Sequence, residues 1–336
     1  MKIGLLDIDS KIPNLALMKI SQWHKQQGDE VEHYMPLAHH LYDKIYASKI
    51  FNFSDGSDIQ PDMIVGGTGI DLKISLPDEI DVMTPDYSLY KYPHNIGFTM
   101  RGCRFKCSFC VVPEKEGKPK SSNTIDELWT QRDSNFLMLL DNDFFGNPNW
   151  SERIEEIKEY NLKVNFSQGL NIRIISERQA QALASVKFRN SHNTKKQVTF
   201  AWDQINDEKV IKRGFQRVVD AGIKPYQMQF YVLIGFETTP EEDMHRVMML
   251  KDWGCDPYVM PYNKDNDYQK RFARWVNHRA TFKSCTFKEY KSYGWQERNT
   301  ALYNTRKKTV SRSHVDTRAV QLCSSMGRSS LLGLSF

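Results

Sequence analysis

The sequence of 336 residues lacks any run of about 18 apolar residues, the length that a membrane-spanning helix requires. Its opening, MKIGLLDIDSKIPN, places acidic side chains directly after a very short apolar run, so no secretory signal is expected. Cysteine is scarce, at six residues, whereas a secreted disulfide framework carries more cysteine in a shorter chain. These deficits predict a cytoplasmic protein without membrane association.

An excess of one sign of charge is also lacking over most of the chain. The 46 Lys and Arg residues nearly balance the 41 Asp and Glu residues, which leaves a formal net charge of +5. Residues 291–336 contain eight of these bases and two of the acids, so the rest of the chain is close to neutral. The near-neutral body gives no electrostatic reason to expect nucleic acid. The basic, Ser-rich tail has a composition typical of disorder.

Three of the six cysteines fall within eight residues, in the segment R-G-C-R-F-K-C-S-F-C-V-V-P. Cys103, Cys107 and Cys110 have the spacing C-x3-C-x2-C, which allows thiolates on one loop to converge on a metal centre. Soft sulfur ligands favour zinc or an iron–sulfur cluster. The neighbouring bases, which are expected to stabilise thiolates and an anionic cluster, are Arg101, Arg104 and Lys106.

The number of nearby ligands bears on the choice between these metals. A structural zinc site has four protein ligands, and an electron-transfer cluster usually has four cysteines. Here no histidine follows within the loop, and the next cysteine is Cys255. Three cysteine ligands on a [4Fe–4S] cluster leave one iron open for chemistry. The alternative is a non-catalytic zinc or iron–sulfur protein, in which Cys255 or His94 supplies the fourth ligand.

The cysteine spacing, with the aromatic Phe109 directly before the third cysteine, resembles the motif of the radical S-adenosylmethionine (SAM) enzymes. The resemblance implies that Cys103, Cys107 and Cys110 bind a [4Fe–4S] cluster whose open iron chelates the amino and carboxylate groups of SAM. It also implies an external flavodoxin-like or ferredoxin-like reductant that supplies an electron. SAM is then cleaved to methionine and a 5′-deoxyadenosyl radical, which abstracts hydrogen from a substrate.

Strand and helix patterns alternate along the middle of the chain. Short apolar runs predict six strands, at 95–100, 135–140, 163–166, 197–202, 227–234 and 257–260. Helices are predicted at 149–160, 176–184, 207–221 and 240–253, and Thr124 with Glu127 forms a capping box for another helix. This alternation predicts a parallel α/β sheet curled into a partial (β/α)6 barrel, with its chemistry at the carboxyl ends of the strands. Radical SAM enzymes have such a fold.

The resemblance also suggests which residues contact SAM. Phe109 resembles the aromatic residue beside the adenine. The other expected contacts are Asp141, Asn142 and Asp143 in place of the family's Gly-Gly-Glu, Gly235 and Glu237 in a segment similar to its fifth-strand motif, and Gln168, Arg173, Asp203 and Asn263 at further strand ends. The alternative for each is an ordinary polar residue at a strand end.

Residues 1–92 resemble the Rossmann-like, cobalamin-binding type of domain that many radical SAM proteins carry. Strands are predicted at 2–8, 30–34, 42–47 and 61–65, and a helix at 14–27. The cobalt-ligating pattern D-x-H-x-x-G is missing, and His24 falls inside the helix, where an ordinary surface histidine is expected. Cobalamin is therefore a doubtful cofactor: either it binds without that histidine or the domain shapes substrate access. Gly66 to Gly69 predicts a tight turn rather than an anion site.

The expected domains are the Rossmann-like unit at 1–92, the barrel at 93–265, a closing helix and strand at 266–290, and the tail at 291–336. The cysteine segment is also similar to that of the tRNA methylthiotransferases. Those enzymes need three more cysteines in the N-terminal domain, and residues 1–102 contain none. Glu116 also replaces a basic residue of their motif, so that activity is disfavoured. Methyl transfer and oxidoreductase chemistry stay open, and a small-molecule or peptide substrate is favoured over nucleic acid.

Overall fold

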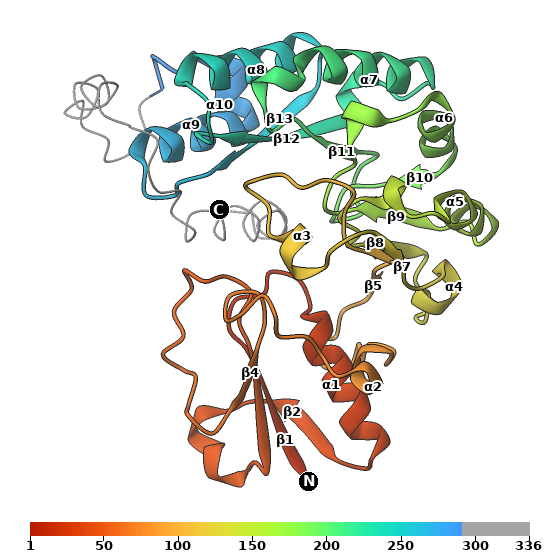
Figure 1. The fold of residues 1–336 in the computed structure, drawn as a ribbon, viewed down its shortest axis with the longest axis vertical. Helices are drawn as coiled ribbons and strands as arrows, with labels where there is room; N and C mark the ends of the chain where they lie inside the picture. Colours follow the sequence, from red (N-terminus) through yellow and green to blue (C-terminus); the bar gives the residue numbers. More distant parts are fainter. Residues whose placement is uncertain (291–336) are drawn as a thin grey trace.

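The computed structural model describes residues 1–290, and the expected disorder of 291–336 lies outside the described residues. Figure 1 shows an N-terminal sheet at one end of the molecule and an arc of strands and helices above it. The protein is a mixed α/β fold whose principal sheets are parallel. Among residues 1–290, no helix is both long enough and apolar enough to cross a bilayer.

The first sheet is parallel and has the strand order β2-β1-β3-β4. Its elements are β1 (Lys2–Asp7), α1 (Leu15–Gln26), β2 (Glu30–His33), the 3-10 segment η1 (Pro36–Leu41), β3 (Lys44–Ser48) and β4 (Ile64–Gly66), followed by the short helix α2 (Asp78–Asp81). Each expected strand and the expected helix are present, with boundaries shifted by up to three residues. A first strand between the second and third is the order of doubly wound α/β sheets.

His24 lies in the core rather than on the helix surface, so the expectation of a surface histidine was wrong. Its side chain is fully buried, with Nδ1 2.6 Å from Asp29 Oδ2 and Nε2 3.0 Å from the Tyr46 hydroxyl. The helical spacing of the buried residues Leu17, Ile20 and His24 places them on one face of α1. The apolar stripe therefore carried a signal for this burial.

Gly67 occupies a tight turn, as expected for the Gly66 to Gly69 segment. Its φ is +104°, and a Cβ there would lie 2.2 Å from the carbonyl oxygen of Lys49. The amide of Gly69 also donates to that oxygen at 2.9 Å. These glycines are explained by the close approach of two backbone segments.

Two further parallel sheets form the arc. One has the order β10-β9-β8-β5 and the other β11-β12-β13. Their strands are β5 (Asn95–Gly97), β8 (Phe136–Leu139), β9 (Lys163–Phe166), β10 (Lys187–Phe188), β11 (Val198–Ala201), β12 (Met228–Ile234) and β13 (Asp256–Pro261). The helices are α4 (Ile125–Leu128), α5 (Trp150–Glu159), α6 (Glu177–Ser185), α7 (Glu208–Asp220) and α8 (Pro240–Asp252), and Figure 1 shows α5 to α8 on the outside of the arc. Short 3-10 segments are η2 (Phe144–Gly146), η3 (Ile172–Ile174), η4 (Ile205–Asp207) and η5 (Pro225–Gln227).

The expected strands do not form one continuous barrel sheet. The short strand β10, which no apolar run predicted, pairs with the first half of β9 and takes the edge that β11 was expected to occupy. Asn165 fastens it further by donating from Nδ2 to the Arg189 carbonyl at 2.8 Å. Beyond the turn at Gly169, one parallel bridge between Leu170 and Phe200 links the two sheets. The result is an interrupted arc of parallel strands.

The C-terminal segment of the described chain is helical. The expected helix is α9 (Asp267–Asn277), but the expected closing strand is absent from 266–290, and α10 (Arg279–Ser284) stands there instead. Asn277 explains why no strand is needed at this edge of β13. Its Oδ1 accepts from the Val259 amide at 2.7 Å, and its Nδ2 donates to the Val259 carbonyl at 3.0 Å.

The strand β8, which pairs with β5, is buried on both faces. Leu137 and Leu139 of β8 pack in the main core beneath the outer helices. The alternate residue Met138 packs against Ile12 and Leu15, which flank the start of α1. A strand covered on both faces reads as a continuous apolar run, which is why β8 was evident in the sequence.

Arg246 of α8 holds the ends of two strands in the second half of the arc. Its side chain is fully buried and donates to the carbonyls of Trp202 and Asp203, after β11, and of Leu233, in β12. It also pairs with Asp243 at 2.6 Å. A buried charge needs such compensation because its desolvation is costly.

Replacing Arg246 by Met is expected to lower the free energy of unfolding by about 3–5 kcal/mol, because Asp243 becomes an unpaired buried carboxylate. Urea denaturation measures this change. The control is Lys212→Met, which breaks the exposed Lys212–Glu208 pair and is expected to cost less than about 1 kcal/mol. Equal losses of unfolding free energy in the two variants would contradict the stabilising role of Arg246.

Candidate functional site: the cysteine loop

The three cysteines lie on a loop that is closed at its base by a short antiparallel pair. Strand β6 (Met100–Arg101) leads into the loop, α3 (Val112–Lys115) follows it, and β7 (Lys120–Ser121) returns beside β6. Gly102 makes the first turn with φ +80°, and a Cβ there would lie 2.3 Å from the Lys118 carbonyl oxygen. The loop therefore leaves from the carboxyl end of β5, where the sequence placed it.

Glu116 braces the start of the loop. Its Oε2 accepts from the Gly102 amide and from Asn142 Nδ2, each at 2.8 Å. Its Oε1 pairs with Arg101 at 2.8 Å. One carboxylate thus joins the residue before Cys103 to the segment after β8. No local pattern indicated these contacts, since the partners lie 14 to 26 positions from Glu116 along the chain.

Asp141 fixes the approach to the loop from behind. Its Oδ1 accepts from the amides of Thr99 and Met100, at 2.7 and 3.2 Å, and its Oδ2 accepts from the Thr99 hydroxyl at 2.5 Å. The carboxyl group is buried, and burial raises its pKa to about 7. Both oxygens of this expected SAM contact are thus engaged with the protein itself.

Asp143 holds the other side of the loop. Its two oxygens accept from Nε and Nη2 of Arg104, at 2.6 and 2.8 Å, in a bidentate pair. The carboxylate is almost completely buried. Asn142 and Asp143, also expected to contact SAM, therefore connect the cysteine loop to the end of β8. Their neighbour Asp141 binds the backbone of Thr99 and Met100, just before the loop.

The tip of the loop contacts the other sheet of the arc. Phe109 packs edge to face against Phe236, with ring centroids 5.4 Å apart, and Phe236 packs in the same way on Tyr262 at 4.8 Å. Cys107 and Cys110 pack partly buried beside these rings. The loop thus spans from the end of β8 to the ends of β12 and β13, across the interruption between the sheets.

Arg173 approaches the loop from η3. Its guanidinium lies over the Phe105 ring, 4.7 Å from the centroid, and Nη1 donates to Asp207 at 3.0 Å. Burial raises the pKa of the Cys107 thiol; Arg173 opposes that rise, and the Asp203 carboxylate adds to it. The expected site residues Arg173 and Asp203 are therefore gathered at the cysteines.

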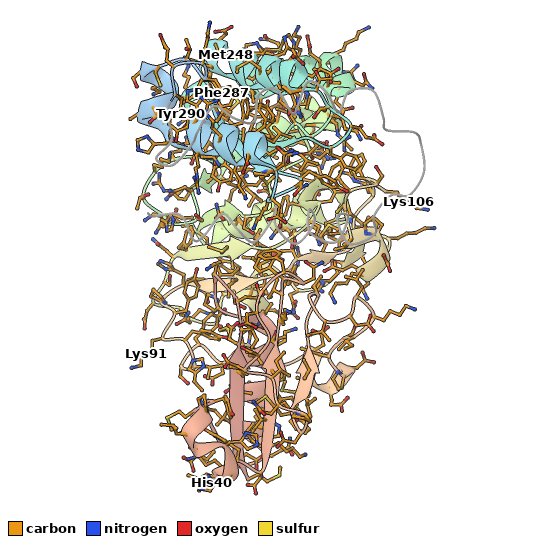
Figure 2. All side chains as sticks on the ribbon, turned by 90° about the vertical axis from the view of Figure 1, so that its left-hand side faces the viewer. His40, Lys91, Lys106, Met248, Phe287 and Tyr290 are labelled. Carbon is orange, nitrogen blue, oxygen red and sulfur yellow. The ribbon has the colours of Figure 1, made fainter. Side chains whose placement is uncertain are left out.

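Lys106 does not contribute as expected. It is exposed, and Figure 2 shows its side chain pointing away from the body of the molecule. The expected bases Arg101 and Arg104 are paired with carboxylates. Arg173 is the cation that acts on Cys107. The tertiary fold selects it, because it is 66 positions from Cys107 in the sequence.

The remaining expected residues fall into two groups. Gly235 lies beneath Gln269, since a Cβ would be 2.0 Å from its Nε2, and Gln168 has a buried Oε1 with no hydrogen-bond partner. Glu237 and Asn263 are exposed. The Asn263 side chain accepts from the Asp265 amide at 2.9 Å in a local turn, and the roles expected for these last two stay predictions.

Neither expected fourth ligand lies at the cysteine loop. His94 precedes β5 and contacts Ser134 at 3.1 Å, before β8. Cys255 precedes β13 in the core, where burial raises its pKa to about 12. Both are at the amino ends of parallel strands, opposite to the loop. Across residues 1–290, no three His, Cys, Asp or Glu side chains are grouped to hold a single metal ion.

The cobalt-ligand position of the N-terminal unit is not filled by a histidine. In the loop after β1, Asp9 accepts from the amides of Ile50 and Phe51, each at 2.8 Å. Asn14 donates to the Ser48 hydroxyl at 2.8 Å, and His24 of α1 is hydrogen-bonded to Asp29 and Tyr46. These polar groups satisfy one another, and they do not fit a histidine-ligated cobalamin.

No protein-family model and no curated protein match the chain. Among solved structures it is similar to apo, selenomethionine-labelled OxsB, described as a cobalamin-dependent S-adenosylmethionine radical enzyme. That alignment has a TM-score of 0.35 and 13% identity, and covers 77% of this chain. The chain spans about half (49%) of the OxsB chain. A likeness at this level does not by itself assign a family.

Replacing Glu116 by Gln is expected to loosen the loop. The substitution removes the negative charge that accepts from Gly102, Asn142 and Arg101. Hydrogen bonds to charged groups contribute about 1.5–3 kcal/mol, so alkylation of Cys103 in metal-free protein should accelerate at least about tenfold. Peptide mass spectrometry measures the rate. Glu114→Gln, at an exposed position on α3, is the control, and equal rates would rule out the brace.

Asp141 is expected to make stability depend on pH. Its folded pKa is raised to about 7 from 3.8, so its contribution is complete below about pH 4 and is lost as the pH rises to about 7. Asp141→Asn should flatten the unfolding free energy in that window, measured by denaturant titration. Asp126→Asn, at an exposed carboxylate, should leave the slope unchanged. A wild-type slope retained in Asp141→Asn would refute the assignment.

Proposed function

We propose that the chain is a radical SAM enzyme whose cluster is held by Cys103, Cys107 and Cys110. The observation that carries the proposal is the position of these cysteines on one anchored loop at the carboxyl ends of parallel strands. In parallel α/β folds this edge is where chemistry takes place. The finer fold, a partial barrel of the radical SAM type with a Rossmann-like unit at 1–92, is part of the same proposal.

The donor set suits a cluster better than zinc. Zinc bonds each thiolate at about 2.3 Å and so requires ligands that converge on one point. The described residues contain no such group. A [4Fe–4S] cluster attaches each cysteine to a different iron, which keeps the sulfurs apart. The cation Arg173 and the partly buried thiols Cys107 and Cys110 suit an anionic cluster.

With SAM bound, the cluster would supply one-electron cleavage to methionine and a 5′-deoxyadenosyl radical. The chain's own residues would bind and orient the cofactor. Phe109 and Phe236 offer an apolar surface for the adenine. Gln168, with its unpartnered buried oxygen, and Asp203, near Cys107, could accept from ribose hydroxyls. An external flavodoxin-like or ferredoxin-like protein would deliver the electron.

A small-molecule or peptide substrate is part of the proposal. On β9 and β11, Asn165 and Thr199 alternate with the apolar core residues and are buried and polar. On β12, buried Tyr231 donates its hydroxyl to the Ser167 carbonyl at 3.2 Å. Asn165 Oδ1 has no partner. Barrel interiors are normally filled by branched apolar residues, so this uncharged polar lining favours a small hydrogen-bonding substrate.

The N-terminal unit is proposed to shape access to this site without binding cobalamin. Its contacts with the arc include two on the side of the cysteine loop and β13, besides the contact at α1. Lys264, after β13, lies 4.2 Å from the Phe53 ring centroid, and Lys115 of α3 donates to the Ile74 carbonyl at 3.3 Å. None of the five cysteines of residues 1–290 forms a disulfide, which suits the proposed reducing cytoplasm.

Anaerobic reconstitution tests the proposal. Wild type should bind about four irons per chain and, with dithionite, convert SAM to methionine and 5′-deoxyadenosine. Replacing Cys103, Cys107 or Cys110 by Ala should abolish cleavage because each removes a cluster ligand. Cys285→Ala, away from the loop, should cleave SAM at the wild-type rate.

Two results would defeat the proposal. Wild type that binds a cluster but never cleaves SAM would be a non-catalytic iron–sulfur protein. Wild type that binds one zinc through the same cysteines would have a structural metal site.

A further inference from the structure

Arg173 makes a contact with the cysteine loop that no sequence motif specifies. Its guanidinium covers the ring of Phe105, which lies between the first two cysteines, at 4.7 Å from the centroid. Its charge also acts on the neighbouring Cys107. A planar, permanently charged group can stack and donate at the same time, whereas a lysine cannot.

The position of Arg173 is fixed by its own anchors. Asn171 Oδ1 accepts from the Arg173 amide at 3.1 Å and from its Nε at 3.2 Å. Asp207, at the start of α7, accepts from Nη1 at 3.0 Å. The side chain retains 24% of its exposure. Two partners on different elements therefore aim the charge at the loop.

Gly214 of α7 brings these anchors together. A Cβ at this position would lie 2.1 Å from the Ile172 carbonyl oxygen, so the helix can approach η3 only with glycine. Glycine is unfavourable inside a helix. Here it allows α7 and η3 to lie in close contact. The turn that carries Arg173 is thus seated directly on α7.

We infer that Arg173 is a positioning residue that raises the electron affinity of the cluster, with Asp207 partly offsetting its charge and Gly214 setting its place. The inference rests on the proposed function. A [4Fe–4S] cluster with three thiolates changes its net charge from −1 to −2 when it accepts one electron. A cation near Cys107 stabilises the more negative state.

The charge change gives the two anchoring partners opposite effects. Arg173→Met removes a positive charge and should make reduction harder, while Asp207→Asn removes a negative charge and should make it easier. A role limited to loop structure would not reverse sign between these variants.

The experiment is an EPR-monitored dithionite titration of the reconstituted full chain, in which one electron enters the cluster. Arg173→Met should lower the reduced-to-oxidised ratio at fixed potential at least tenfold, which corresponds to a midpoint 59 mV more negative. Asp207→Asn should shift the midpoint positively. Arg173→Lys, which keeps the charge, should fall between wild type and Arg173→Met.

Arg132→Met is the matched control. Arg132 also stacks on an aromatic ring, Trp129, at 4.6 Å and pairs with a carboxylate, Asp126, at 2.8 Å, but it precedes β8 at the edge opposite to the loop. Its midpoint should equal that of wild type. Iron content is measured for every variant, so that a lost cluster is distinguished from a shifted one.

The inference is overturned if Arg173→Met binds a full cluster and its midpoint potential equals that of the control Arg132→Met. It is also overturned if Arg173→Met loses its cluster while Asp207→Asn keeps one at the wild-type potential. Wild type that cleaves SAM alongside either result leaves the proposed function standing. Wild type that assembles no cluster overturns both.

Discussion

The architecture of the site depends on carboxylates that accept from the backbone of the cysteine loop. A loop with three closely spaced cysteines and little regular secondary structure cannot satisfy all of its own amides, and an unsatisfied buried amide is costly. Asp141 takes the amides before the loop, and Glu116 takes the amide of Gly102. Because these acceptors come from outside the turn, the loop has a defined course from protein contacts alone.

The loop also compensates for the interruption of the sheet. Strand β10 separates the two parallel sheets, and within residues 1–290 a single β-bridge, between Leu170 and Phe200, links their backbones. The loop contacts both, through Asp143 on one side and Phe236 on the other. The candidate site therefore lies where the two halves of the arc meet, and its side chains depend on both halves for their placement.

Local periodicity revealed most of the elements but few of the contacts within the site. Strand β9 was predicted at its observed bounds, because Val164 and Phe166 alternate with the polar Lys163 and Asn165, as in a strand with one apolar face. Strand β10, with two residues, is too short to show a pattern. The position of Cys107 was evident from its spacing, whereas its neighbour Arg173 comes from a distant turn. Such partners are chosen by tertiary packing, which leaves no periodic trace in the sequence.

The amide of Asn277 has a consequence for association between molecules. An open arc has exposed strand edges, and an unpaired edge is a template for pairing with another chain. At Val259 the side chain of Asn277 occupies both the donor and the acceptor that an added strand would use. The arc can thus remain open on this side without offering a free edge there, so resistance to edge-to-edge aggregation does not require a closed barrel.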